Sequence, residues 1–164
     1  LLGLRRGRKM RLRTRLSTLS LAQVHELAAR FAERNFKGNA RARDRIRLVC
    51  EETVHALLEM GGYAIDAQPG PAGPAPAAKL KLDIQSTGDS VELSVGVAPL
   101  DADINDLIDA SQQSSRPLAV ADLSFRVLGG LVDELQHYRY FGLDFISLKF
   151  DPLRPALRST AATA

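Results

Sequence analysis

The sequence predicts an α+β fold of two layers, in which helices pack on one face of a mixed, mostly antiparallel sheet. The first observation is the order of the periodic segments, which runs strand, helix, helix, hairpin, helices, hairpin. The second is that 164 residues, 45% of them hydrophobic and 25% charged, suit one globular domain with a substantial core. The third is that aromatic residues make up only 5% of the chain and Trp is absent, so that the core must be aliphatic.

The chain begins with a basic segment that leads into a predicted edge strand. The basic residues of this segment are Arg5, Arg6, Arg8, Lys9, Arg11, Arg13 and Arg15, and no acidic residue lies among them. We interpret residues 1–10 as a basic arm, and the alternation of apolar and basic residues from Met10 to Leu16 predicts an edge strand. The apolar start before the basic cluster is typical of a transmembrane helix that leaves the bilayer on its cytoplasmic side. A solvated basic arm is the alternative interpretation.

Two amphipathic helices are predicted next. Ser20 is expected to begin the first helix through a capping box with Gln23, and this helix should end near Lys37 and Gly38. The second helix should start after Asn39 and stop at Gly61. Its apolar face repeats at helical spacing and consists of Ile46, Val49, Cys50, Thr53, Leu57 and Met60.

Four side chains on these helices, Glu51, Glu52, Cys50 and His25, belong to types that can carry chemistry. The neighbours Glu51 and Glu52 point in directions about 100° apart, so that at most one of them can face a site beside the core. Cys50 is the only cysteine, which excludes an internal disulfide and a cysteine metal cluster and suggests a buried, inert thiol. His25 lies off the apolar stripe and is expected at the surface.

The second half of the chain is predicted to contain two hairpins separated by helices. Residues 63–78 are rich in Pro and Gly and should form a loop, and residues 79–87 and 90–97 alternate as the strands of a hairpin. Residues 101–109 suggest a short acidic helix, residues 111–117 a polar loop, and residues 138–150 a closing hairpin that turns at Gly142. A further helix is predicted from the spacing of Leu123, Val127, Leu128, Leu131, Val132 and Leu135, with His137 near its end. Residues 11–151 would thus form a single domain, followed by a frayed tail over residues 152–164.

Three segments together resemble a known family. They are the helix with VCEETVHALLEMGG, the hairpin ending in VGVAPLDADI, and the late stretch DLSFRVLGGLVDELQHYRYFGLDFISLKF. Their order and spacing are similar to the GHKL-type ATPase (Bergerat) fold in its short bacterial form, the anti-sigma-factor serine kinases. The resemblance runs from about residue 11 to residue 150.

The resemblance also implies where an ATP site would lie, and the sequence departs from the family there. Glu52 falls on the position of the general base, and Ala56 falls on the Asn that binds magnesium; alignment on Glu51 instead places His55 there. Val95 falls on the Asp that recognises adenine, and Ser124 falls on a phosphate-binding Gly. Ala and Val offer no oxygen ligand for these tasks. The sequence therefore suggests an ATP site that is degraded, with no cofactor and no metal expected.

Two functions follow from this resemblance. The first is a non-catalytic or weakly nucleotide-binding regulatory or interaction domain, the cytosolic part at the inner membrane face of a larger protein such as a xanthine/uracil-type permease. Its partners would be a protein or the parent membrane protein and an anionic lipid surface, contacted by Arg5, Arg6, Arg8, Lys9 and Arg11. The alternative is an active anti-sigma-factor serine kinase that binds ATP, Mg²⁺ and a sigma factor. The sequence does not exclude a homodimer. Nucleic acid is not favoured as a partner, because no folded basic face with interleaved aromatic residues can be identified.

Overall fold

A computed structural model describes residues 9–16, 18–60, 79–97 and 120–154. These residues form five strands and three helices. In chain order they are β1 (Lys9–Arg15), α1 (Thr18–Asn35), α2 (Ala40–Met60), β2 (Lys79–Thr87), β3 (Ser90–Val97), α4 (Val120–Leu131), β4 (Glu134–Tyr140) and β5 (Leu143–Phe150). The predicted loops at 63–78 and 111–117 and the predicted acidic helix at 101–109 lie outside the described residues.

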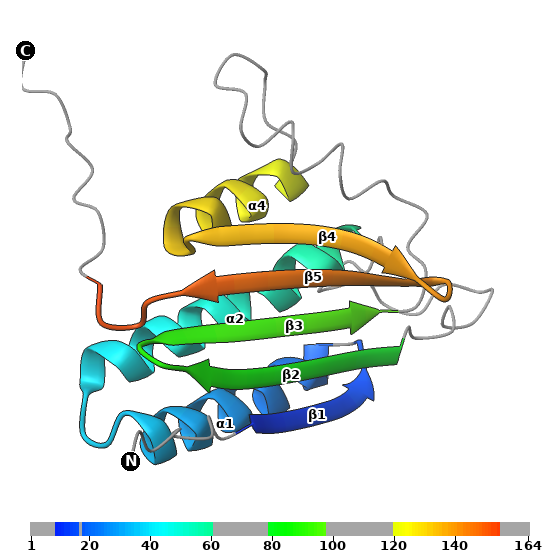
Figure 1. The fold of residues 1–164 in the computed structure, drawn as a ribbon. Helices are drawn as coiled ribbons and strands as arrows, with labels where there is room; N and C mark the ends of the chain where they lie inside the picture. The colour runs from blue at the N-terminus through cyan, green and yellow to red at the C-terminus, as the bar shows by residue number, and fades with distance from the viewer. Residues whose placement is uncertain (1–8, 17, 61–78, 98–119, 155–164) are drawn as a thin grey trace, which may run out of the picture.

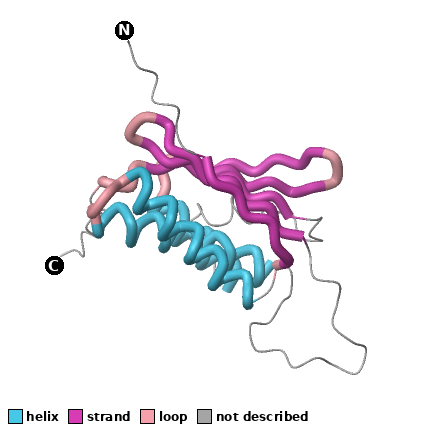
Figure 2. Tube along the Cα trace, turned by 90° about the horizontal axis from the view of Figure 1, so that it is seen from below, coloured by secondary structure: helices cyan, strands magenta, loops and turns pink. Residues whose placement is uncertain are grey.

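The strands form one open sheet with the order β1-β2-β3-β5-β4. Each neighbouring pair is antiparallel, so the described sheet contains no parallel pair where a mixed sheet was predicted. The three helices lie on one face of the sheet, which makes two layers (Figures 1 and 2). The predicted α+β fold with helices on one face is therefore confirmed, and β1 is an edge strand as expected.

The second helix is the centre of the core, as its apolar face predicts. Ile46, Val49, Cys50, Thr53 and Leu57 are all fully buried. The helix begins directly after Asn39, whose side-chain Oδ1 accepts a hydrogen bond of 3.0 Å from the backbone N–H of Ala42 and so caps the first turn. Burial raises the pKa of the Cys50 thiol to about 12, which agrees with an inert core cysteine.

Alternation along the strands divides the sheet into an inner face, turned to the helices, and an outer face. In β2 and β3 every second residue from Leu80 to Val97 is a buried aliphatic side chain, apart from the turn region. The predicted turn between them is present, and Gly88 has a φ of 63° that favours glycine. The closing hairpin likewise turns at Phe141 and Gly142, where both residues have positive φ.

The predicted last helix was wrong in its extent and in its buried face. Helix α4 ends at Leu131, and Leu135 belongs to β4. Phe125 and Leu128 are the buried side chains, whereas Leu123 and Val127 are 52% and 39% exposed. The helical spacing continues to Leu135 by coincidence, because Leu135 lies in β4, which pairs with β5.

The start of α1 differs from the prediction, and α4 contains two open glycines. Helix α1 begins at Thr18, so Ser20 lies within its first turn instead of capping it. Gly129 and Gly130 of α4 are exposed, and a Cβ on either would meet no atom within 4 Å. Close packing against the sheet therefore does not account for these two glycines.

The chain after β5 stays attached to the domain as far as Arg154. The Arg154 guanidinium pairs with Asp133, and its carbonyl accepts a hydrogen bond of 3.0 Å from Arg45 of α2. Pro152, at the start of the predicted frayed tail, is buried. None of the helices in the described ranges is long and apolar enough to cross a membrane.

Candidate functional site

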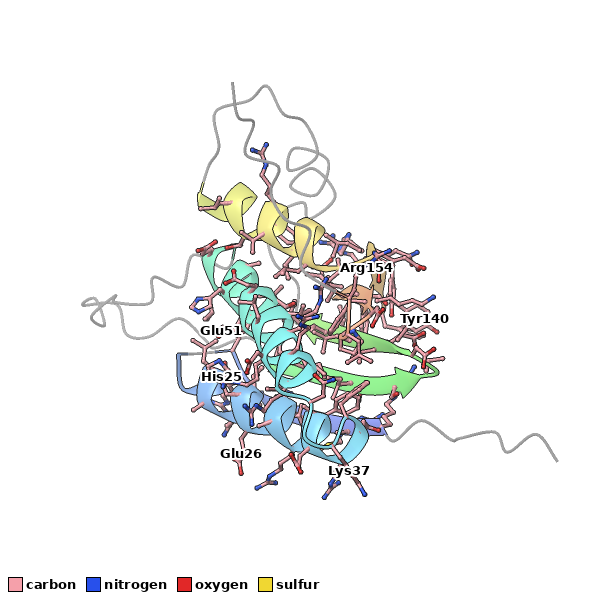
Figure 3. All side chains as sticks on the ribbon, turned by 90° about the vertical axis from the view of Figure 1, so that its left-hand side faces the viewer. His25, Glu26, Lys37, Glu51, Tyr140 and Arg154 are labelled. Carbon is pink, nitrogen blue, oxygen red and sulfur yellow. The ribbon has the colours of Figure 1, made fainter. Side chains whose placement is uncertain are left out.

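The C-terminal half of α2, where the sequence places the candidate general base, lies between α1 and α4. Glu51 lies close to two histidines, one on α1 and one on its own helix. His25 Nε2 of α1 lies 3.1 Å from Glu51 Oε2 (Figure 3). His55 Nε2 of α2 lies 3.9 Å from Glu51 Oε1. The His25 contact is not an aligned hydrogen bond, because His25 Nε2 makes none with the described residues. His25, predicted at the surface, is thus partly covered, with 32% of its side chain exposed.

Glu52, the predicted general base, is half-buried beside this group. It makes no hydrogen bond or ion pair with any residue that the structure describes, whereas Glu51 has the two imidazole contacts. Of the two neighbouring carboxylates, Glu51 is therefore the one that is joined to another helix. A carboxylate with two imidazoles can hold or pass a proton, but the described residues bring no nucleophile to it.

Ser124, at the predicted phosphate position, is held by α2. Its side chain is largely buried, and its hydroxyl donates a hydrogen bond of 2.9 Å to Glu59 Oε2. This bond joins the first turns of α4 to the end of α2. The hydroxyl is therefore committed to a carboxylate, which is the wrong neighbour for a phosphate oxygen because the two anions repel each other.

Val95 and Ala56, at the positions for adenine and magnesium, belong to the core. Both are fully buried, Val95 on the inner face of β3 and Ala56 on α2. Val95 pairs with Leu82 and Ile146 in the neighbouring strands, so its side chain packs with the aliphatic layer under the helices. These positions contribute packing, and neither carries a polar atom on its side chain.

The predicted anion-contacting residues are only partly described. Lys9 and Arg11 lie on β1 and both pair with Asp83 of β2, at 3.7 Å and 2.6 Å, while Arg5, Arg6 and Arg8 lie outside the described residues. Burial by itself raises the pKa of Asp83, but the hydrogen bond from Arg11 and the nearby positive charges lower it below its usual value. Lys9 and Arg11 are thus neutralised in part within the sheet.

Sequence reasoning missed a buried polar cluster between β4 and β5. Asp144, which is fully buried on the inner face of β5, accepts hydrogen bonds from Arg139 Nε at 2.8 Å and Arg139 Nη2 at 3.1 Å. His137 Nε2 lies 3.0 Å from Asp144 Oδ1, and only 4% of its side chain is exposed. His137 was predicted near a helix end, and this was wrong because the strand starts at Glu134. The alternation ELQHYRY was the signal that could have revealed it.

The described residues bring together acid–base pairs but no group of three or more His, Cys, Asp or Glu side chains that could hold a metal ion. The predicted site residues Glu52, Val95 and Ser124 lie on three different elements, α2, β3 and α4. No protein-family model matches the chain, and none of the curated proteins is detectably similar to it in sequence.

Proposed function

We propose that the chain is a regulatory or interaction domain of GHKL-like fold that is non-catalytic or binds nucleotide only weakly. The observation that supports this proposal is that the residues at the ATP-motif positions pack in the core or bond to another side chain. Val95 and Ala56 are packed in the core, and the Ser124 hydroxyl is bonded to Glu59. An ATP site at these positions would need polar groups that are free to meet adenine, magnesium and phosphate.

Isothermal titration of the chain with ATP and MgCl₂ tests this proposal. We expect no saturable heat beyond that of a titration with MgCl₂ alone, or only binding in the millimolar range. A dissociation constant in the micromolar range would contradict the proposal and would favour the active serine kinase, which can then be tested by transfer of the γ-phosphate to a serine-containing partner.

We further propose that the domain is the cytosolic part of a larger membrane protein, such as a nucleobase permease, and lies at the inner face of the membrane. The basic arm supports this, because each Lys or Arg near an anionic surface contributes about 1 kcal/mol. Lys9 and Arg11 share Asp83, which leaves Arg5, Arg6 and Arg8 as the residues to test.

Co-sedimentation with phosphatidylglycerol-containing vesicles compares the natural chain with the triple variant Arg5→Ala, Arg6→Ala, Arg8→Ala. This variant leaves β1, which starts at Lys9, intact. We expect weaker binding by the variant, and equal binding would contradict the membrane contact of the arm. A variant that removes three exposed cations of the loop and helix α2, Lys37→Ala, Arg41→Ala and Arg47→Ala, controls for net charge.

A further inference from the structure

The outer face of the sheet has two unlike halves. Residues that pair across antiparallel strands point to the same face, so the register defines rows of neighbouring side chains. Two rows at one end contain carboxylates from Asp83, Glu92 and Glu134, each in contact with a polar or basic neighbour. The two rows at the other end, where β1 and β3 finish, contain no acidic residue among those described.

This second half combines cations with aromatic side chains, and we call it the cationic–aromatic face. One of its rows is Arg13, Lys81, Gly96, Phe145 and Tyr138, and the other contains Arg15, Lys79, Leu143 and Tyr140. The cations lie on β1 and β2 and the rings on β4 and β5. In Figure 3 the labelled Tyr140 lies in the part of the molecule that the sheet occupies, away from the helices that carry His25 and Glu51.

The rings form a platform that is open to solvent. Tyr138 and Phe145 stack in parallel, with ring centroids 5.2 Å apart and planes 7° apart. The Phe145 ring leans over Gly96, since a Cβ there would lie 2.7 Å from Phe145 Cε1. Tyr138 and Tyr140 are 46% and 61% exposed, which is high for side chains of this size. The glycine therefore lets the aromatic surface extend from β4 across to β3.

Three of the cations beside this platform have no acidic partner among the described residues. Lys81 lies 3.6 Å from Asp83, but Arg13, Arg15 and Lys79 make no ion pair there. A hollow of about 550 Å³ lies beside the cations, and its lining includes Arg13, Arg15, Lys79, Lys81, Gly96 and Leu143. Its rim is positively charged, and Gly96 and Leu143 contribute no polar side-chain atom to its lining.

We propose that the cationic–aromatic face binds single-stranded nucleic acid. Phosphates would lie against Arg13, Arg15 and Lys79, and unpaired bases would stack on Tyr138 and the ring beside it. Lys79 on β2 lies two strand spacings from β5, and Arg13 and Arg15 on β1 lie three, so neighbouring nucleotides of one strand can contact the cations and the rings together, because adjacent strands lie about 5 Å apart. Duplex ends fit less well, since their bases are already stacked. The sequence alone showed no such surface, because residues 13–15, 79–81 and 138–145 become neighbours only through the strand order.

This inference does not rest on the proposed function, because it uses the face of the sheet opposite to the helices and the candidate ATP positions. The chain can bind nucleic acid whether or not it binds ATP. A result that contradicts one of the two proposals therefore does not contradict the other. The ATP titration and the nucleic-acid measurement use different ligands.

Fluorescence anisotropy with a labelled oligothymidylate of about 15 nucleotides tests the proposal at several salt concentrations. The natural chain is compared with the triple variant Arg13→Ala, Arg15→Ala, Lys79→Ala and with the charge-matched variant Lys37→Ala, Arg41→Ala, Arg47→Ala. We expect the first variant to bind at least about tenfold more weakly and the slope of log K against log salt to fall by about 2, since each phosphate contributes about 0.7. The charge-matched variant should bind within about twofold of the natural chain.

Substitution of Tyr138 separates stacking from general electrostatics. Tyr138→Ala should weaken binding by about tenfold, and Tyr138→Phe should restore it, because the ring and not the hydroxyl carries the stacking. Circular dichroism confirms that each variant is folded.

Four outcomes would overturn the proposal: no saturable binding by the natural chain, equal loss in both triple variants, equal binding by Tyr138→Ala, or tighter binding to a self-complementary duplex than to the single strand. Phosphatidylglycerol vesicles are measured in parallel with the variant Arg5→Ala, Arg6→Ala, Arg8→Ala, which lacks three cations of the basic arm. If the further changes Arg13→Ala, Arg15→Ala and Lys79→Ala weaken the binding of vesicles but not of oligothymidylate, the face binds a lipid surface instead, which contradicts the proposal.

Discussion

His137 Nε2 on β4 and Asp144 Oδ1 on β5 lie 3.0 Å apart in the layer between the sheet and the helices, where 4% and 0% of their side chains are exposed. Arg139 binds the same carboxylate through two nitrogens. A buried carboxylate is costly unless it is paired and hydrogen-bonded, and this one is both. The cluster therefore fixes β4 against β5 at the end of the sheet that carries the exposed aromatic residues.

Replacement of this carboxylate should destabilise the domain. Asp144→Asn removes the negative charge but keeps the shape, and we expect the free energy of unfolding to fall by about 2 kcal/mol. This loss is smaller than that expected for a fully buried ion pair, because 55% of the Arg139 side chain is exposed. Urea unfolding followed by circular dichroism measures it. Asp89→Asn, in the exposed turn after β2, is the control and should change stability by less than about 0.5 kcal/mol. Equal effects of the two substitutions would show that the cluster adds no stability.

The carboxylate of Asp83 predicts a pH dependence. Burial favours its protonated form, but the hydrogen bond from Arg11 and the charges of Lys9 and Lys81 outweigh it, so the pKa is lowered on folding. A lowered pKa adds stability above the unfolded-state pKa of about 3.9, and this is lost as the pH falls through the folded-state value. Asp83→Asn should therefore lower the free energy of unfolding by about 0.5–1 kcal/mol at neutral pH, since the cationic partners are half-exposed.

The difference between Asp83→Asn and the natural chain should disappear when both are measured well below the pKa of the folded carboxyl group. A difference that stays constant with pH would mean that the substitution acts through packing and not through charge.

The contact between Gly96 and Phe145 predicts opposite effects for two glycines. Gly96→Ala would place a methyl group 2.7 Å from Phe145 Cε1, so the ring must move, and we expect a loss of about 1–3 kcal/mol. Gly129→Ala in α4 meets nothing within 4 Å and should increase stability by up to about 1 kcal/mol, because alanine favours the helix. Unfolding curves of both variants test this. A neutral Gly96→Ala would show that the ring does not lie over β3.

Strain at the tip of the last hairpin gives a further prediction. Phe141 has a φ of 49° and is 87% exposed, which is unfavourable for its backbone and leaves its ring mostly in water. Phe141→Asn should raise the free energy of unfolding by about 0.5–1 kcal/mol, because asparagine tolerates this conformation. Gly142→Ala, at a φ of 69°, should lower it by about 1 kcal/mol. If Phe141→Asn is destabilising instead, the edge contact of Phe141 with Tyr140, at 4.3 Å between ring centroids, outweighs the strain.

The sequence by itself determined the elements whose periodicity is long and uninterrupted. The buried face of α2 from Ile46 to Leu57 and the alternation of β2 and β3 were predicted correctly, because one side of each element must meet the apolar core. The end of α4 was predicted wrongly, since Leu135 fits the helical spacing although it lies in strand β4. A short apolar run contains too few residues to distinguish the helical period from the strand period.

Only the tertiary structure decided which polar residues meet. His137 faces Asp144 because the register of β4 with β5 brings together residues on both sides of the turn, and a shift of one residue would move each side chain to the other face. Arg13, Lys81, Gly96 and Phe145 form one row because β5 lies beside β3 and not beside β2. Local propensity fixes the direction of each side chain along its own strand. The neighbours across the sheet depend on strand order, which the packing of the whole chain selects.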